Sequence, residues 1–337
     1  MKPFIVPVFI PHAGCPHQCA FCNQKSISGQ GSEQVSLQAV REQIDRFLAF
    51  PHHKRQKLQI SFYGGNFLGL PRETICSLLD VACGFIQQGQ VEGIRFSTRP
   101  DTISDATLQL IREYPVHTVE IGVQSMDDRV LTKCRRGHTA RDTEMAVRLL
   151  KATPYEIGLQ MMMGLPGDSA TATRMTARRI ADFTPDFVRI YPALVLKGSP
   201  MAAWFASGKF MPLALDEAVH RVKSLYLFFR KKGIPVIRMG LQASDALNSE
   251  NAVLAGPYHP AFGHLVLSSI WLDRAVELLA AEKISGQTAV FRVRPQNISR
   301  LRGQQNHNIR KLMQMFPLNA VEVKPDEKMG GEDMRLE

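Results

Sequence analysis

The sequence predicts an α/β protein: a partial (β/α)6 TIM-like barrel followed by a C-terminal helical and small α+β extension. Over the first two-thirds of the chain, short apolar segments alternate six times with amphipathic segments of helical period. This order is typical of a parallel sheet with right-handed crossovers. Six units are too few for a closed barrel of eight, so we expect a curved, partly open sheet.

The predicted elements can be given in chain order. Six segments have the length and apolar character of strands buried on both faces: 4–10, 58–62, 94–98, 118–123, 157–163 and 187–191. Five segments with helical periodicity separate them: 36–50, 72–87, 105–113, 142–151 and 170–183. Strand and helix therefore alternate without interruption up to Pro192.

The rhythm changes in the last third of the chain. Helices are expected over 216–232, 265–281 and 308–316, and strands over 235–242, 288–294 and 319–324. We place domain boundaries to give a barrel (1–212), a helical extension (213–285), a small α+β region (286–330) and a tail (331–337). Residues 328–337 are polar and expected to be frayed.

Composition limits the class of protein. The chain has 337 residues, 45% hydrophobic and 21% charged, as in ordinary soluble globular proteins. It has neither a signal peptide nor an apolar stretch of membrane-spanning length, so we expect a cytoplasmic, reducing location and no membrane partner. The net charge of +10 is compatible with an RNA partner. Cys76, Cys83 and Cys134 have no motif spacing and are expected to be reduced structural thiols.

The most informative motif is the C-x3-C-x2-C loop formed by Cys15, Cys19 and Cys22 directly after the first predicted strand. Three thiolates on one loop can hold three corners of a [4Fe–4S] cluster and leave the fourth iron open to a small molecule. The alternative is a structural zinc site with His17 as fourth ligand, although no second cysteine pair follows. Phe21 either packs beside the cluster or fills space under the loop.

Further segments follow in order: Tyr63–Asn66, Phe96–Asp101, Glu120–Asp127, Arg135–Thr139, Met163–Gly167 and Ile190–Pro192. With the cysteine loop they resemble the radical S-adenosylmethionine (radical SAM) superfamily, above all the radical half of the elongator catalytic subunit (elongator protein 3-like). They are similar, more distantly, to oxygen-independent coproporphyrinogen dehydrogenases. The resemblance covers residues 4 to 325, and we expect the chain to lack the acetyltransferase domain of the elongator relatives.

The resemblance implies that the three cysteines bind a [4Fe–4S] cluster whose fourth iron is chelated by S-adenosylmethionine (SAM). The backbone at Gly64 and Gly65 would meet the SAM amino group, where glycine permits close approach. Asn66 stands where an acidic residue is common. The full set of residues that the resemblance places at SAM is Phe21, Gly64, Gly65, Asn66, Ser97, Gln124, Arg136, Gln160, Met163, Gly164 and Leu165.

Within that set, Gln124 and Arg136 would hold the SAM carboxylate or ribose, since arginine forms forked hydrogen bonds with carboxylates. Ser97 and Gln160 would hydrogen-bond the ribose, and the backbone from Met163 to Leu165 would meet the adenine. Two nearby charged residues have simpler interpretations as well: Glu120 as a structural ion-pair partner, and Arg99 as the partner of Asp101.

The implied activity is reductive cleavage of SAM to a 5′-deoxyadenosyl radical that abstracts hydrogen from a substrate, with electrons from a flavodoxin- or ferredoxin-like donor. RNA or tRNA is the substrate class we favour. Around Arg300, Arg302 and Gly303, a strand–loop–helix–strand order resembles a reduced KH module, whose glycine loop clamps phosphates. The alternatives are a radical enzyme for a small metabolite or tetrapyrrole, and a zinc-stabilised RNA-binding protein without catalysis.

Overall fold

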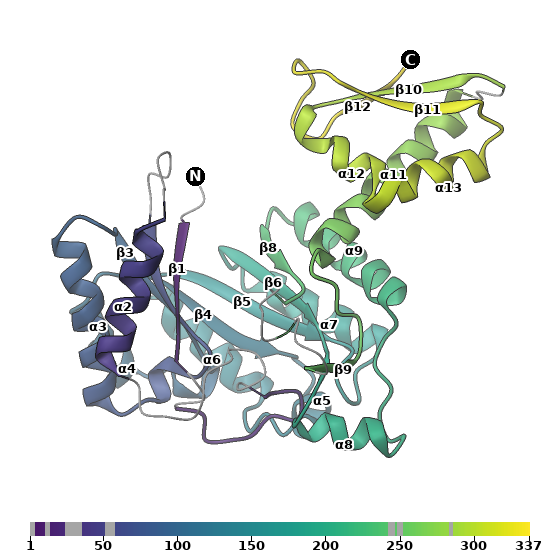
Figure 1. The fold of residues 1–337 in the computed structure, drawn as a ribbon. Coiled ribbons are helices and arrows are strands. Elements are labelled where there is room, and N and C mark those ends of the chain that lie inside the picture. The colour runs from purple at the N-terminus through teal and green to yellow at the C-terminus, as the bar shows by residue number, and fades with distance from the viewer. Residues whose placement is uncertain are drawn as a thin grey trace.

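A computed structural model describes residues 4–10, 14–23, 36–50, 58–241, 247, 252–282 and 286–337. Its main feature is a seven-stranded sheet with all neighbouring strands parallel, in the order β1-β2-β3-β4-β5-β6-β8 (Figure 1). The strands are β1 (Phe4–Phe9), β2 (Leu58–Tyr63), β3 (Gly93–Thr98), β4 (Val116–Gln124), β5 (Glu156–Met163), β6 (Phe187–Pro192) and β8 (Val236–Met239).

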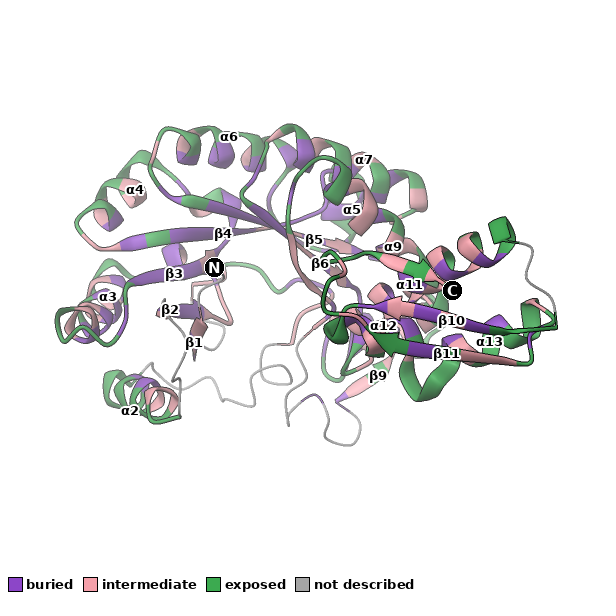
Figure 2. Ribbon diagram, turned by 90° about the horizontal axis from the view of Figure 1, so that it is seen from above, coloured by how far each residue is buried: buried purple, intermediate pink, exposed green. Residues whose placement is uncertain are grey.

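The predicted parallel α/β sheet is confirmed, and a seventh strand extends it. The strand expected over 235–242 forms β8 (Val236–Met239), which pairs with β6. Viewed from above, the strands follow an arc with helices outside it (Figure 2). We call this curled sheet the half-barrel.

Helices cover the convex side of the half-barrel. They are α2 (Leu37–Leu48), α3 (Arg72–Gln87), α4 (Asp105–Arg112), α5 (Asp128–Lys133), α6 (Ala140–Lys151) and α7 (Ala170–Asp182). Capping boxes begin two of them, with Ser104 and Thr107 at α4 and Thr139 and Asp142 at α6. These reciprocal side-chain bonds satisfy backbone groups that have no partner within the helix.

The two faces of the sheet differ in polarity. Residues facing the helices are apolar and fully buried, such as Val8, Phe96 and Leu159. Alternate residues on the concave face are polar, and several of these are also buried, among them Arg95 and Glu120. The strands are thus buried on both faces as expected, but only one face is hydrophobic.

One long helix joins the half-barrel to the C-terminal region. After β6 come β7 (Val195–Leu196), α8 (Pro200–Ala206), α9 (Leu215–Lys231), β9 (Val253–Ala255) and α11 (Phe262–Glu282). The first turns of α11 place Phe262 and Val266 in the main core. Farther along, Trp271 and Leu279 belong to a second core. The helix therefore contributes to both cores.

The C-terminal unit is a three-stranded sheet covered by helices. Its elements are β10 (Thr288–Val293), α12 (Ile298–Arg302), α13 (His307–Met315), β11 (Ala320–Pro325) and β12 (Met334–Leu336). Strand β10 pairs parallel with β11 and antiparallel with β12. The expectation of a frayed tail is therefore wrong, because Met334–Leu336 complete the sheet and Met334 and Leu336 pack against its core. Within the described ranges, no helix combines the length and apolarity needed to cross a membrane.

Candidate active site

The cysteine loop is held on both sides by backbone hydrogen bonds. Ala20 N donates to the Cys134 carbonyl at 2.8 Å, and Met201 N donates to the Ala20 carbonyl at 2.9 Å. Cys19 is buried, and Cys15 and Cys22 are half-buried. All three thiols lie on this one loop. Within the described ranges, no group of three His, Cys, Asp or Glu side chains is placed to hold a single metal ion.

Arg136 connects this loop to the edge of the sheet. Its Nη1 lies 3.4 Å from the Cys19 Sγ, and its Nη2 donates to the Gly122 carbonyl at 2.8 Å. Its Nε is buried without a hydrogen-bond partner. A buried guanidinium that contacts a cysteine sulfur and still has an unused donor is suited to a negatively charged ligand at the loop.

The segment around Arg136 packs closely on the cysteine loop. Gly137 has φ +76°, and a Cβ atom there would lie 2.1 Å from the His17 ring. Only glycine fits this approach without strain. Phe21 is half-buried in a small apolar cluster with Val130 and Leu165, which supports the packing role for its ring.

A strained residue ends strand β4 beside this contact. Gln124 is buried with φ 65°, and the β4–β5 register shifts between Gly122 and Gln124. Gln160 Nε2 donates to the Gln124 Oε1 at 3.2 Å. Bulges and left-handed non-glycine residues concentrate at functional sites. The structure thus brings Gln124, Gln160 and Arg136 together.

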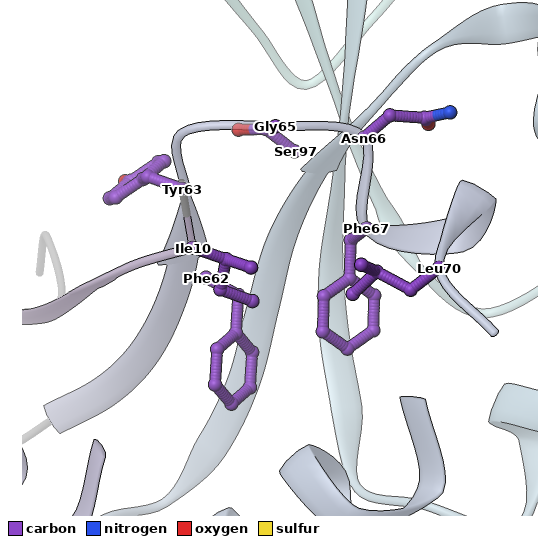
Figure 3. A pocket seen from close by; sticks show the side chains of 8 residues that line it. All are labelled: Ile10, Phe62, Tyr63, Gly65, Asn66, Phe67, Leu70 and Ser97. Carbon is purple, nitrogen blue, oxygen red and sulfur yellow. The ribbon is translucent and has the colours of Figure 1, made fainter. Parts of the chain in front are cut away.

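The turn after β2 carries Gly64, Gly65 and Asn66 and lines a small pocket (Figure 3). Asn66 is fully buried. Its Oδ1 accepts from Thr98 Oγ1 at 2.7 Å, Thr102 Oγ1 at 2.9 Å and the Arg99 N–H at 3.0 Å, and its Nδ2 donates to the Gly14 carbonyl at 2.8 Å. The side chain joins the cysteine loop to the end of β3. The lining residues are Ile10, Phe62, Tyr63, Gly65, Asn66, Phe67, Leu70 and Ser97.

The turn after β5 is fixed by its own contacts. Gly164 has φ 71° and donates its N–H to Asp168 Oδ2 at 2.9 Å. The Met163 carbonyl accepts from Ala193 N at 2.9 Å, and Leu165 is buried. This turn lies at the same carboxyl edge as the cysteine loop, the edge where parallel α/β sheets bind ligands.

Buried polar groups near the loop were not assigned to any ligand by the sequence motifs. Arg99 pairs with Asp101 at 2.7 Å, as the simpler interpretation held, yet its Nη1 is buried without a partner. His138 is 4% exposed, and neither ring nitrogen has a well-aligned partner. Burial, with the Arg136 and Arg99 guanidiniums, lowers the pKa of His138 to about 3. The sequence carried no signal that these buried atoms would lack hydrogen-bond partners, because only the folded chain determines their surroundings.

The concave face holds a second polar group, of which the sequence predicted only the ion-pair role of Glu120. Glu120 accepts from Arg95 Nη2 at 2.7 Å and pairs with Arg189 Nε at 2.5 Å. Arg189 Nη2 donates to the Tyr63 hydroxyl at 3.1 Å, and Nη1 donates to the Tyr191 hydroxyl at 3.3 Å. The predicted structural role of Glu120 is confirmed. Polar residues at alternate positions in apolar strands were the available signal.

The predicted RNA-binding residues lie far from this site along the chain. Arg300 and Arg302 belong to α12 rather than to a loop, so the order is strand–helix–turn–helix–strand. Gly303 has φ 70° and begins the turn before α13. Arg302 and Gly303 line an open groove of about 570 Å³. Asn308 fixes the turn from beneath, donating to the Ser268 and Leu301 carbonyls at 2.9 and 3.0 Å.

The donor set fits an iron–sulfur cluster with a bound anionic nucleotide. Thiolates are the protein ligands of such clusters, and the loop supplies three of them. The unpartnered Arg136 Nε and Arg99 Nη1 are cationic donors close to those thiols. The residues present therefore suit a [4Fe–4S] cluster and the carboxylate of SAM.

Comparison with known proteins identifies the family. Residues 9–180 match the model of the radical SAM superfamily, and residues 185–271 match the radical SAM C-terminal domain. The first match covers just over half of the 337 residues. The chain belongs to the radical SAM superfamily, and it is an enzyme of that superfamily.

Its relatives include enzymes named for tRNA. A tRNA uridine(34) acetyltransferase of Methanocaldococcus infernus is 27% identical over 253 residues, or 64% of this chain and 47% of that protein. Human Elongator complex protein 3 is 26% identical over 291 residues, or 69% of this chain and 52% of that protein. The chain thus spans about half the length of the curated relatives it matches.

A solved structure shares the fold. Elp3 of M. infernus, with its N-terminal residues deleted, superposes with a TM-score of 0.60 at 22% identity, covering 81% of this chain and 63% of that one. The resemblance to the elongator catalytic subunit is confirmed.

Proposed function

We propose that this enzyme binds a [4Fe–4S] cluster through Cys15, Cys19 and Cys22, and binds SAM at the open iron. The observation that carries the proposal is the three-cysteine loop against the buried Arg136, within a chain of the radical SAM superfamily. When bound, the reduced cluster would cleave SAM to a 5′-deoxyadenosyl radical that abstracts hydrogen from the substrate.

The protein's own residues would bind and orient SAM. Arg136 and Gln124 lie beside the cysteine loop and suit the carboxylate or ribose, with Gln160 in contact with Gln124. Ser97 lies near the end of β3, in the pocket at the turn after β2, and suits the ribose. The glycine turn after β2 suits the SAM amino group, and the turn at 163–165 suits the adenine. Asn66 acts through the Gly14 carbonyl rather than through its own contact with SAM.

Air-free reconstitution tests this proposal. We expect about four irons per chain, broad visible absorption, and release of 5′-deoxyadenosine from SAM on reduction. Replacing Cys19 with Ser should abolish all three, whereas replacing the buried Cys134 with Ser should retain the cluster. Zinc with no iron in the air-free protein, or iron without SAM cleavage, contradicts the proposal. A cytoplasmic location and a flavodoxin- or ferredoxin-like electron donor belong to the same proposal, since the cluster needs a reducing compartment.

We further propose that the substrate is RNA, and that tRNA is the favoured class of RNA. Support comes from the named tRNA relatives and from the open groove at the turn between α12 and α13, which Arg302 lines. Arg302 is exposed there, and Arg300 is held by Asn297 Oδ1 at 2.9 Å. Gly303 begins the turn that precedes α13, and the N-terminus of a helix favours anions such as phosphate.

The test measures binding of total tRNA against salt concentration. Changing Arg300 and Arg302 to Glu should weaken binding and lower the salt slope by about one to two. The matched control changes the exposed Arg41 and Arg46 of α2 to Glu, which alters net charge equally at the other side of the molecule (Figure 1). Equal losses in both variants contradict a site at the groove.

A turnover assay distinguishes an RNA that reacts from an RNA that only binds. Deuterated tRNA, incubated air-free with SAM and reductant, should pass label to 5′-deoxyadenosine. Transfer of label from a small acidic metabolite or tetrapyrrole, with none from tRNA, would overturn the RNA proposal and leave the radical SAM chemistry intact.

A further inference from the structure

We propose that Tyr63, Arg189 and Tyr191 bind an anionic oxygen group of the substrate, a carboxylate or a phosphate, inside the half-barrel. The inference rests on the proposed function, because it concerns the substrate of the same site.

The three residues face one another across the concave side of the sheet. Tyr63 ends β2 and Arg189 lies in β6, with three strands between them. Their side chains nevertheless hydrogen-bond at 3.1 Å. Strands this far apart in a flat sheet could not bring their side chains into contact. The contact therefore crosses the hollow of the curled sheet. Tyr63, Arg189 and Tyr191 are only half-buried, so this face remains partly open to a ligand.

A glycine leaves room for this arrangement. Arg189 pairs with Glu120 of β4 across β5, and Gly158 of β5 is the register partner of both Glu120 and Phe187. A Cβ atom on Gly158 would lie 2.3 Å from the Phe187 ring and 3.1 Å from Glu120 Cγ. The absence of a side chain at this position leaves the space that the Phe187 ring fills beside Glu120.

Among the described residues, two guanidiniums meet one carboxylate on this face. Glu120 is paired with both Arg95 and Arg189. The other acidic residue at an inward position of β5 is Glu156, exposed at the opposite end of the strand. Excess positive charge in a half-buried site is stabilised by an anionic ligand.

Hydroxyl donors complete the group. Both tyrosine hydroxyls accept a hydrogen bond from Arg189, so each keeps its own proton to donate. Burial raises the pKa of Tyr191, which keeps its phenol protonated at neutral pH. On the same face of β2, Ser61 is fully buried and its hydroxyl has no partner. Buried polar groups without a partner indicate that something else completes their bonding.

The position suits a substrate. Tyr63 directly precedes the glycine turn assigned to SAM (Figure 3). A substrate whose anionic group contacts Tyr63 and Tyr191 would lie beside the cofactor, where a radical could reach a neighbouring C–H bond. For an RNA substrate the anionic group is a nucleotide phosphate. For a small acid it is a carboxylate.

Calorimetry on the full-length, air-free, reconstituted protein with saturating SAM tests the proposal. The probes are inorganic phosphate, propionate, and propionamide as the neutral counterpart of propionate. We expect phosphate or propionate to bind and propionamide not to bind. Tighter binding of phosphate favours a nucleotide phosphate as the natural ligand, and tighter binding of propionate favours the carboxylate of a small acid. The double variant Tyr63→Phe, Tyr191→Phe keeps both rings and should weaken anion binding about tenfold per hydroxyl. Tyr226→Phe on α9 is the matched control.

Several outcomes overturn the proposal. Anion binding that survives the double substitution belongs elsewhere on the protein. Equal binding of propionamide removes the role of charge. Anion binding that occurs without SAM but is lost with saturating SAM would make this the site of the SAM carboxylate. If the wild-type protein binds anions at this site but never cleaves SAM, the proposed function is overturned and the anion site is not.

Discussion

Changing Asn66 to Asp should loosen the cysteine loop, although the family resemblance implies an acidic residue at this position. The substitution keeps the size of the side chain and an acceptor for Thr98, Thr102 and Arg99. It removes the donor to the Gly14 carbonyl and places a second oxygen against that carbonyl at a former hydrogen-bond distance of 2.8 Å. Gly14 directly precedes Cys15, so the disturbance falls on a cluster ligand.

The magnitude follows from these contacts. Loss of one neutral hydrogen bond costs about 1 kcal/mol, and a buried acceptor left facing a carboxylate costs about 1–3 kcal/mol more. The donors that remain on Oδ1 bind a carboxylate more strongly and offset part of this loss. A Cβ atom on Gly69 would lie 2.2 Å from Asn66 Nδ2, so the side chain has no space in which to turn away. We expect a net loss of about 2 kcal/mol in the free energy of unfolding.

Two measurements check this, urea unfolding of the metal-free protein and iron bound per chain after reconstitution. Asn297→Asp is the matched control, because Asn297 is also fully buried and donates to a carbonyl, that of Gly331, at 2.7 Å. Both variants should be less stable, but only the change at Asn66 should reduce iron uptake. Wild-type stability and full iron in Asn66→Asp, or tighter SAM binding, would refute the reasoning.

Three further predictions follow from the structure. Because the buried His138 protonates only near pH 3 and an unfolded histidine near 6.5, the unfolded state holds more protons below pH 6.5. Acidification from pH 7.5 to 5 should therefore cost wild type about 2 kcal/mol more than His138→Gln in paired urea titrations. Gly137→Ala should lower iron uptake, since its Cβ would strike the His17 ring; unchanged iron content argues against this packing. Deleting residues 333–337 removes β12 and should expose amides of β10 to hydrogen exchange, whereas equal protection would show that the strand is dispensable.

Local patterns were sufficient for most of the architecture. The alternation of apolar and amphipathic segments predicted the parallel sheet because hydrophobic periodicity reflects which face each residue buries. The cysteine loop was equally readable, since all three ligands lie within eight residues. Arg136 and Gln124 could be assigned only through family resemblance, because Arg136 meets Cys19 across 117 residues of sequence.

The order of strands and helices, the three-cysteine loop and the class of enzyme could all be predicted from patterns within short stretches of the chain. Tertiary structure alone decided the polar concave face, the unpartnered atoms of Arg99 and His138, and the return of Met334–Leu336 to pair with β10. The physical reason is curvature and distance. Tyr63 and Arg189 are 126 residues apart, and only the curl of the sheet brings them within hydrogen-bonding range.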